Sequence, residues 1–515
     1  MGTSDNSGKA GRMTRRALLG TGAIAGVAAT LGGPGAAAPR AMPDNWDEEV
    51  DVIVIGSGFA GLAAAHEATK AGASVALLEK MQVPGGNSII NGGVMAVAGS
   101  DQQTKMGIED SAELMLADML KAGMGLNHVT LARTVAEHSV DVYRWTVDEL
   151  GVAYKDSLTH MGGHAVPRAY STSNGSGSGI IVQQLAKLKE LGIEPRTRTL
   201  LKHIIRDEDG RVKGVEVREK HAYRDPESGD PKTIKARKAV VLASGGFGND
   251  PIFRMMQDPR LTDELDTTNQ PGATSEVLRE AMNIGGILIQ PSWIQLGPWT
   301  SPDEKGMGMA PSFVQGTTAS YGLWINTETG ERFVDELADR KIRADAIIAT
   351  GNKAIAIADA AGFKYAKGRG TKVDRMLETG VLTKYATLEE MAAAHDVPLE
   401  PLKSTIKRFN ASVDAGRDGD KGRYMQADQF KLGDGPYYAV RLLPKVHHTM
   451  GGIGMNVETQ ALDVVTGDPI PGLYVAGEAA GGVHGASRLG SCATTECLVF
   501  GRIAGKNAAA EENWG

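Results

Sequence analysis

The stretch from residue 51 to residue 79 constrains the fold of this chain more than any other. Residues 52–55 form a short apolar run with the length and β-branched content of a buried parallel strand. Gly56, Gly58 and Gly61 follow at G-x-G-x-x-G spacing, and an alanine-rich stretch without a helix breaker comes next. Strand, glycine turn and helix in this order are typical of a dinucleotide-binding unit, in which the backbone approaches a pyrophosphate at the helix N-terminus.

A second apolar run and two glycine loops extend this pattern. Residues 74–78 read as the next parallel strand and end on Glu79, at a place where an acid binds a ribose hydroxyl. The glycine-rich segments that follow, at 84–88 and at Gly92 and Gly93, predict close approach of the backbone to a flat ligand. The βαβ unit predicts a bound dinucleotide but does not choose between NAD and FAD.

Length, charge and cysteine content exclude several classes of protein. With 515 residues the chain has sequence for about three domains. The net charge of −7 is spread out, with no basic block beyond the extreme N-terminus, which argues against nucleic acid as a partner. The two cysteines, Cys492 and Cys497, are interpreted as small buried residues, and the sequence contains no C-x-x-C-H motif for a c-type haem.

The N-terminal 47 residues are interpreted as an export signal and linker. Two arginines in the segment 14–19 precede a Gly/Ala-rich apolar run that ends near Ala38, which resembles a twin-arginine signal. An uncleaved membrane anchor is the alternative, although Pro34 and the many small residues disfavour it. We expect a periplasmic protein with no stable membrane span after cleavage.

Periodicity and turn residues predict the remaining elements. Helices are expected at 109–121, 128–150 and 180–191, and strands at 211–219, 238–247 and 473–476. Thr387 and Glu390 predict a capping box before one of two helices that end near residue 415. A last helix is expected from about Ser491 to about residue 505, with its positive end near a reduced flavin. Glu478 lies just past the strand 473–476, at the edge where open α/β sheets bind ligands.

Three C-terminal motifs carry a family resemblance. HHTMGG (447–452), GLYVAGEAAGGVHGASRLG (472–490) and FGRIAG (500–505) resemble the soluble fumarate reductase and flavocytochrome c flavoproteins. Succinate dehydrogenase flavoproteins, urocanate reductases and 3-ketosteroid dehydrogenases belong with them. The resemblance implies an α/β fold, with a Rossmann-like FAD-binding domain and an inserted α+β capping domain. The expected boundaries are 1–47 for the export signal and linker, 48–291 and 448–515 for the FAD-binding domain, and 292–447 for the capping domain.

The resemblance also implies the cofactor and the electron donor. FAD is expected to be non-covalent, because residues 88–93 contain no histidine. Many relatives carry a haem or FMN domain that this chain lacks, so a separate cytochrome c is the expected donor. The expected cofactor-binding residues are Gly56, Gly58, Ala60, Gly61, Glu79, Asn87, Ser88, Gly92, Gly93, Glu478, Ala493 and Thr494.

The family chemistry is carried over to matching positions. His448 and Arg488 are expected to hold a substrate carboxylate, with Gly93 and Ser491 beside it, and no metal is expected. The stretch GERFVDELADR places Arg340 where the family has its proton donor. A guanidinium is a poor acid on its ordinary pKa, so it must act transiently and be re-protonated. His447 is expected to be structural.

Two departures from the family bear on the substrate. Fumarate reductases hold a second carboxylate with a His-Pro-Thr stretch and a Thr-Glu pair, whereas the stretches here are 295–299 (QLGPW) and 313–316 (FVQG). The resemblance also implies that the relay arginine of the family is replaced here, near Thr318. A buried dianion without partner groups is costly, so we expect an α,β-unsaturated monocarboxylate such as acrylate, methacrylate or an arylacrylate. Its far end is expected against Trp299 or Tyr321.

Three other functions remain open on the sequence. One alternative is a fumarate reductase or succinate dehydrogenase proper. A second is a ketosteroid-type dehydrogenase, which HHTMGG with Arg488 disfavours. A flavin-bearing electron-relay protein without its own chemistry is the third. NADH as direct donor is disfavoured because no second nucleotide fingerprint occurs.

Overall fold

The computed structural model describes residues 42–433 and 435–514. The predicted export signal lies outside the described residues. Among the residues described, none of the helices has the length and apolar composition needed to cross a bilayer.

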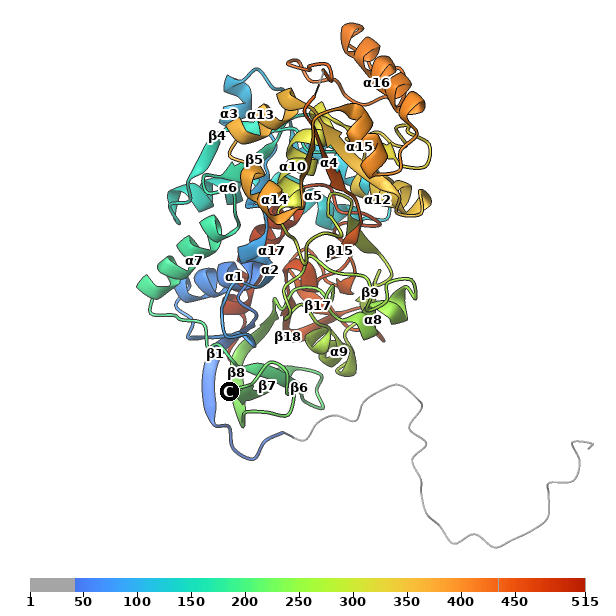
Figure 1. Ribbon diagram of the computed structural model, residues 1–515. Helices are drawn as coiled ribbons and strands as arrows, with labels where there is room; N and C mark the ends of the chain where they lie inside the picture. Colours follow the sequence, from blue (N-terminus) through green and yellow to red (C-terminus); the bar gives the residue numbers. More distant parts are fainter. Residues whose placement is uncertain (1–41, 434, 515) are drawn as a thin grey trace, which may run out of the picture. The chain divides into compact units, whose positions relative to one another are not determined.

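A seven-stranded sheet forms the base of the fold (Figure 1). Its order is β17-β18-β8-β1-β2, with β7 paired to β8 and β6 paired to β7. Strands β18, β8, β1 and β2 run parallel, and they read as continuous apolar runs because both faces of a parallel sheet are covered. The strands are β1 (Glu48–Ile55), β2 (Val75–Leu78), β6 (Leu200–Arg206), β7 (Val212–Glu219), β8 (Asp230–Leu242), β17 (Gln460–Leu462) and β18 (Pro469–Val475).

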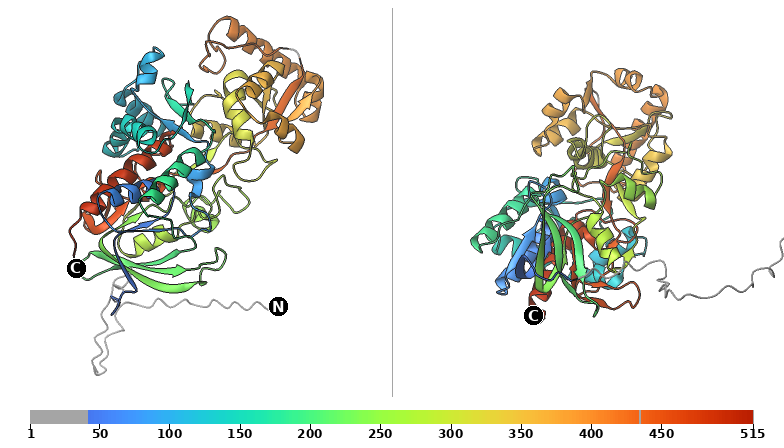
Figure 2. Two further views of the ribbon diagram at one scale, coloured as in Figure 1. Left: turned by 90° about the vertical axis from the view of Figure 1, so that its left-hand side faces the viewer. Right: turned by 90° about the horizontal axis from the view of Figure 1, so that it is seen from below.

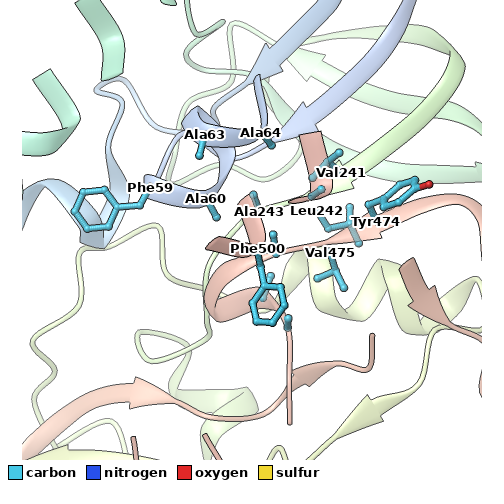
Figure 3. Close-up of a cluster of buried hydrophobic side chains, with 14 of the residues drawn as sticks. Phe59, Ala60, Ala63, Ala64, Val241, Leu242, Ala243, Tyr474, Val475 and Phe500 are labelled. Atoms are coloured by element: carbon cyan, nitrogen blue, oxygen red, sulfur yellow. The ribbon is translucent and has the colours of Figure 1, made fainter. Parts of the chain in front are cut away.

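Two helices cover this sheet and pack closely on each other. They are α1 (Phe59–Lys70) and α17 (Cys492–Ala510), which lie side by side in Figure 2. A Cβ atom at Gly501 or Gly505 would collide with the α1 backbone, so both glycines permit the approach. Figure 3 shows Ala60, Ala64 and Phe500 of this contact beside residues of β8 and β18. The close contact places the start of α1 at the carboxyl end of β1.

A smaller sheet and a set of helices surround this core. The sheet is β3-β5-β4, and two short strands, β9 (Leu288–Ile289) and β16 (Gly452–Ile453), pair separately. Its strands are β3 (Val94–Ala96), β4 (Tyr154–Thr159) and β5 (Ala169–Thr172). The helices are α2 (Gly86–Ile90), α3 (Asp101–Lys105), α4 (Ala112–Ala122), α5 (Val129–Glu137), α6 (Ser139–Asp148), α7 (Ser178–Glu190), α8 (Pro251–Gln257) and α9 (Glu276–Asn283).

The single helix predicted at 128–150 is wrong. The structure has α5 and α6, separated at His138, whose φ of −92° and ψ of 4° are not helical. The side chain of Ser139 then donates to the Ala136 carbonyl (2.8 Å) and accepts from the Ala98 amide (3.2 Å). Because both helices bury apolar residues at helical spacing, periodicity alone does not reveal the break.

An antiparallel sheet with its own helices is inserted in the sequence between β8 and β17 of the seven-stranded sheet. Its order is β11-β12-β14-β13, and residues 310–442 gather about it in Figure 1. Its strands are β11 (Leu323–Asn326), β12 (Ala354–Ala358), β13 (Thr383–Tyr385) and β14 (Tyr437–Arg441). The helices are α10 (Ala310–Phe313), the π-helix η1 (Val314–Thr318), α11 (Ala319–Tyr321), α12 (Arg340–Ala349), α13 (Ala360–Gly368), α14 (Val373–Thr379), α15 (Leu388–Ala394) and α16 (Leu399–Asp414).

The predicted capping box before α15 forms only in part. The Thr387 side chain accepts from the Glu390 amide (3.1 Å), as predicted. The Glu390 carboxylate accepts instead from the amide of Ala386 (2.8 Å), one residue before the N-cap. The last helix, α17, also runs to Ala510, beyond the predicted end near residue 505.

Two adjacent strands connect the inserted sheet to the rest of the chain. Strand β10 (Ile294–Gly297) pairs antiparallel with β15 (Lys445–Thr449). Gln295 lies opposite His448, and Gly297 lies opposite Lys445. We call residues 298–444 the capping segment; the domain boundaries given above stay a prediction.

Candidate active site

A cavity of about 850 Å³ lies at the carboxyl ends of the parallel strands. Seven of the predicted cofactor-binding residues line it: Gly56, Gly58, Ala60, Glu79, Asn87, Ser88 and Glu478. The βαβ unit therefore forms one wall of this cavity, and the turn after β8 (243–245) forms part of another.

The cavity wall has the features that a dinucleotide requires. The N-cap residue of α1, Gly58, has no side chain; Ser88 Oγ accepts from the amide of Phe59 (3.1 Å), and the following N–H groups of the first turn face the cavity end of the helix. The carboxylate of Glu79 accepts from the amide of Ser57 (3.2 Å), its hydroxyl (2.6 Å) and the amide of Met81 (2.8 Å). Ser244 has a buried hydroxyl without a partner among the described residues. FAD fits this donor set.

The remaining predicted cofactor residues lie outside the cavity lining. Gly61 packs directly beneath the turn, where a Cβ atom would collide with the Gly56 carbonyl. Gly93 has a φ of +62° and lies against Thr172 and Ser176. Gly92 directly precedes Gly93 in the chain. Ala493 and Thr494 lie in the first turn of α17, which begins at Cys492 after Ser491, a residue with a left-handed backbone conformation. Their roles stay predictions.

Arg340 of the capping segment reaches the C-terminal loop. Its side chain is buried, and Nη1 donates to Gln295 Oε1 (3.3 Å). The Gln295 amide in turn donates to the Arg488 carbonyl (3.0 Å) and to Ser487 Oγ (3.0 Å). The Arg340 guanidinium also lies over the Trp299 ring, 4.5 Å from its centre. These contacts bring the predicted proton donor beside the predicted carboxylate-binding arginine.

His448 completes the cluster from strand β15. Its Nδ1 lies 3.3 Å from Glu478 Oε1, and the same oxygen accepts from the Thr449 amide (2.9 Å). Burial lowers the pKa of His448; Glu478 opposes this shift and Arg488 adds to it. Glu478 thus lines the cofactor cavity and also orients the His448 ring.

Neither arginine of the cluster is engaged in an ion pair with a described side chain. Among residues 42–433 and 435–514, no carboxylate lies within 4.0 Å of Arg340 or Arg488, and Arg488 Nε has no hydrogen-bond partner. Burial lowers the pKa of Arg340 well below its ordinary value, and Arg488 and Arg343 act in the same direction. Buried guanidiniums without anions favour binding of an anion between them. The site is therefore built for a carboxylate.

The structure corrects one expected contact and reveals others. Tyr321 was expected near the substrate, but its hydroxyl donates to Asp428 (2.5 Å) and its ring packs on Tyr365 (4.3 Å) and Phe430 (5.0 Å). It therefore belongs to a separate aromatic group within the capping segment. Trp299 does lie at the site, and the His447 ring meets it edge-on (5.2 Å).

Sequence reasoning missed Gln295, because a lone glutamine carries no motif. Its place opposite His448 is visible only once β10 and β15 are paired. The two cysteines are free: Cys492 is buried, as predicted, whereas Cys497 is partly exposed and lines the cofactor cavity. No group of side chains in the described part of the chain is arranged to hold a metal ion.

The chain is similar to known flavoproteins over nearly its whole described length. The family described as FAD binding domain matches residues 51–494. The acrylate reductase flavoprotein subunit of Shewanella woodyi is 42% identical over 498 residues, which cover 96% of this chain and 97% of that protein. A fumarate reductase (cytochrome) of Shewanella frigidimarina is 37% identical over 467 residues, covering 90% and 77% of the two chains. The solved open conformation of a flavocytochrome c3 fumarate reductase matches with a TM-score of 0.72 at 34% identity, covering 90% of this chain and 79% of the other.

Proposed function

The chain belongs to the FAD binding domain family, and on this premise we propose that it reduces the C=C bond of an α,β-unsaturated monocarboxylate. FAD is its cofactor, and it is an oxidoreductase that acts on the C=C bonds of unsaturated carboxylates. The finer proposal is that the substrate has one carboxylate and a small apolar end. Acrylate and methacrylate are the simplest acids of this kind, and arylacrylates are larger ones.

One observation carries the choice of a monocarboxylate. Arg340 lies over the Trp299 ring, and Trp299 stands where the family's fumarate reductases have a polar His-Pro-Thr stretch. At the second departure, the side-chain oxygen Oε1 of Gln315 already accepts from Arg343 Nη1 (2.8 Å). A second carboxylate would face an indole ring and lose its hydration without a partner, which is costly.

The residues have distinct roles in the proposal. Arg488 and His448 hold the carboxylate, which polarises the adjacent C=C bond, and Glu478 fixes the His448 ring. Once bound and reduced by the electron donor, FAD would supply a hydride to the β-carbon. Arg340 gives a proton to the α-carbon from the opposite side, and burial, which lowers its pKa, makes it a better acid than a surface arginine.

The electron source and location are also part of the proposal. We propose non-covalent FAD and a separate cytochrome c donor in the periplasm. The support is the predicted export signal and the name of the relative, fumarate reductase (cytochrome).

A substrate screen tests the proposed function. Purified flavoprotein, reduced with a viologen, is mixed with acrylate, methacrylate, cinnamate, urocanate and fumarate, and re-oxidation of the flavin is followed by absorbance. We expect a monocarboxylate to give at least about a hundredfold higher kcat/KM than fumarate, because an unpaired buried carboxylate costs about 3–5 kcal/mol. Fast turnover of fumarate would contradict the proposal and identify a fumarate reductase.

A double substitution should move the preference toward a dicarboxylate. Gly297→His with Trp299→Thr restores a polar stretch around Pro298, and a Cβ atom at Gly297 meets nothing closer than 3.6 Å. We expect the ratio of kcat/KM for fumarate over acrylate to rise about tenfold or more, since a hydrogen bond to a charged group contributes about 1.5–3 kcal/mol. Trp299→Phe is the matched control, because it keeps an apolar ring, and its ratio should stay unchanged. An equal change in both variants would show that lost packing, not a restored partner, sets the ratio.

A further inference from the structure

Asp339 carries a buried carboxylate oxygen without a partner next to the proposed proton donor. This residue is the N-cap of α12, and Arg340 is the first residue of that helix. Its Oδ1 accepts from the Lys341 amide (2.8 Å) and from Ser487 Oγ (2.9 Å). Its Oδ2 is buried and makes no hydrogen bond to the described residues, although the residue as a whole is partly exposed. The Oδ2 atom of Asp339 therefore lies inside the protein, while the residue as a whole also reaches the solvent.

A hydrogen-bonded chain fixes the Asp339 carboxylate beside the site. Arg340 donates to Gln295 (3.3 Å), Gln295 donates to Ser487 (3.0 Å), and Ser487 donates to Asp339 (2.9 Å). Because the chain begins and ends on neighbouring residues, it orients the guanidinium and the carboxylate toward the same space. Ser487 is itself almost fully buried.

Asp339 faces three guanidiniums without touching any of them. Burial lowers the pKa of Arg340, Arg343 and Arg488, and the charge of Asp339 opposes this shift in all three. Among the described residues, however, no nitrogen of these arginines lies within 4.0 Å of its oxygens. A gap of this kind between a buried oxygen and several N–H donors suits a bridging water.

Two other acids of the segment before α12 are engaged elsewhere. Glu336 is fully buried in ion pairs with Arg332 (2.6 Å) and Arg423 (3.3 Å). Asp335 accepts from the amide of Leu337 (2.8 Å). At Thr318 the hydroxyl accepts from the Trp324 ring nitrogen (3.1 Å), and no ionisable group stands there. Asp339 is therefore the acid placed to serve Arg340.

We propose that Asp339 recharges Arg340 after each turnover; this inference rests on the proposed function. An N–H bond of Arg340 breaks as its proton forms the new C–H bond at the α-carbon of the substrate. The Asp339 carboxylate takes a proton from solvent and passes it, through a bridging water, to the neutral guanidine. A new N–H bond forms on Arg340, and the Asp339 carboxylate is regenerated. Asp339 acts through Arg340 and touches no substrate atom.

Comparing the rate of the first turnover with the steady-state rate distinguishes a proton-relay role of Asp339 from a structural role. Asp339→Asn keeps the N-cap, because asparagine caps a helix as well as aspartate, but it cannot carry the proton. In stopped flow with pre-reduced flavoprotein and the accepted acid, Arg340 starts protonated. In Asp339→Asn we expect the rate of the first flavin re-oxidation to stay within about twofold of the parent rate. The steady-state kcat should fall at least about tenfold, which is less than the full effect of losing a general acid or base. Asp339→Glu should recover most of the steady-state rate.

The matched control is another carboxylate on helix α12. Asp345→Asn removes an exposed carboxylate of α12, paired with Lys341 (2.6 Å), and should change neither phase. Equal slowing of both phases in Asp339→Asn would overturn the inference and make Asp339 a residue that only positions Arg340. Unchanged kinetics would assign the recharging to another group. If Asp339→Asn loses flavin, Asp339→Gly, which costs an N-cap little, carries the same comparison. If the parent protein reduces none of the acids, the proposed function is rejected. This outcome is distinct from a failure of the relay alone, in which the parent is active and the two phases of Asp339→Asn change equally or not at all.

Discussion

Replacement of Arg340 by alanine is expected to lower kcat by about a hundred- to ten-thousand-fold, the range of general acid–base catalysis. The reason is that Arg340 brings a buried N–H donor from the capping segment to the anion cluster, held by Gln295 and Trp299. Flavin content and the rate of flavin reduction by viologen should stay those of the parent, because Arg340 does not line the cofactor cavity. Steady-state assays with the accepted acid, beside a flavin absorbance spectrum, measure both quantities.

A lysine at this position should rescue little of the activity. Its ammonium keeps the charge, but it has no planar group to lie on Trp299 and bind Gln295 together. Arg369→Ala, at the exposed end of α13, is the matched control and should leave kcat unchanged. If Arg340→Ala retained more than a tenth of the parent kcat, another group would have to be the proton donor.

A single methyl group at Gly61 should weaken FAD binding by about ten- to a hundredfold, since overpacking costs about 1–3 kcal/mol. A Cβ atom there would collide with the carbonyl of Gly56, which is backbone and cannot rotate away. The Gly56 turn lines the cofactor cavity, so its displacement removes the surface that a pyrophosphate needs. Titration of the apoprotein with FAD, followed by flavin fluorescence, gives the Kd of Gly61→Ala.

An alanine in open space is the control for this prediction. Gly368, at the end of α13, has no atom within 4 Å of an added Cβ. Gly368→Ala should bind FAD as the parent does, and both variants should show the same far-ultraviolet circular dichroism. An unchanged Kd in Gly61→Ala would mean that the turn relaxes without cost, contrary to the packing described.

The sequence predicted the fold where the signals are local. The βαβ unit follows from a strand, a glycine turn and a helix in adjacent positions, and the structure has β1, α1 and β2 there. The Rossmann-like architecture with an inserted α+β segment followed from the family resemblance. The break at His138 was missed because both flanking helices share one apolar periodicity.

The candidate site was predictable only through motifs. The resemblance placed Arg340, His448 and Arg488 in one site, and the structure brings them together. Gln295 was missed because its partners are remote in sequence and no spacing links them. Tyr321 was misplaced because aromatic content does not tell which face of a helix meets the site. Asp339 lay inside a quoted motif, but only the structure shows its unpaired oxygen.

The pairing of β10 with β15 brings the two ends of the capping segment together, so that the segment could be exchanged as a unit. Gly297 and Lys445 are neighbours across the ladder, so the excursion between them leaves and rejoins the scaffold at a single point. Arg340 and Trp299 lie inside that excursion, whereas His448 and Arg488 lie outside it. Recombination between homologous genes at these two codons would therefore move Arg340, the proposed proton donor, with Trp299, while Gln295, which holds Arg340, and the proposed anion-binding residues would come from the host.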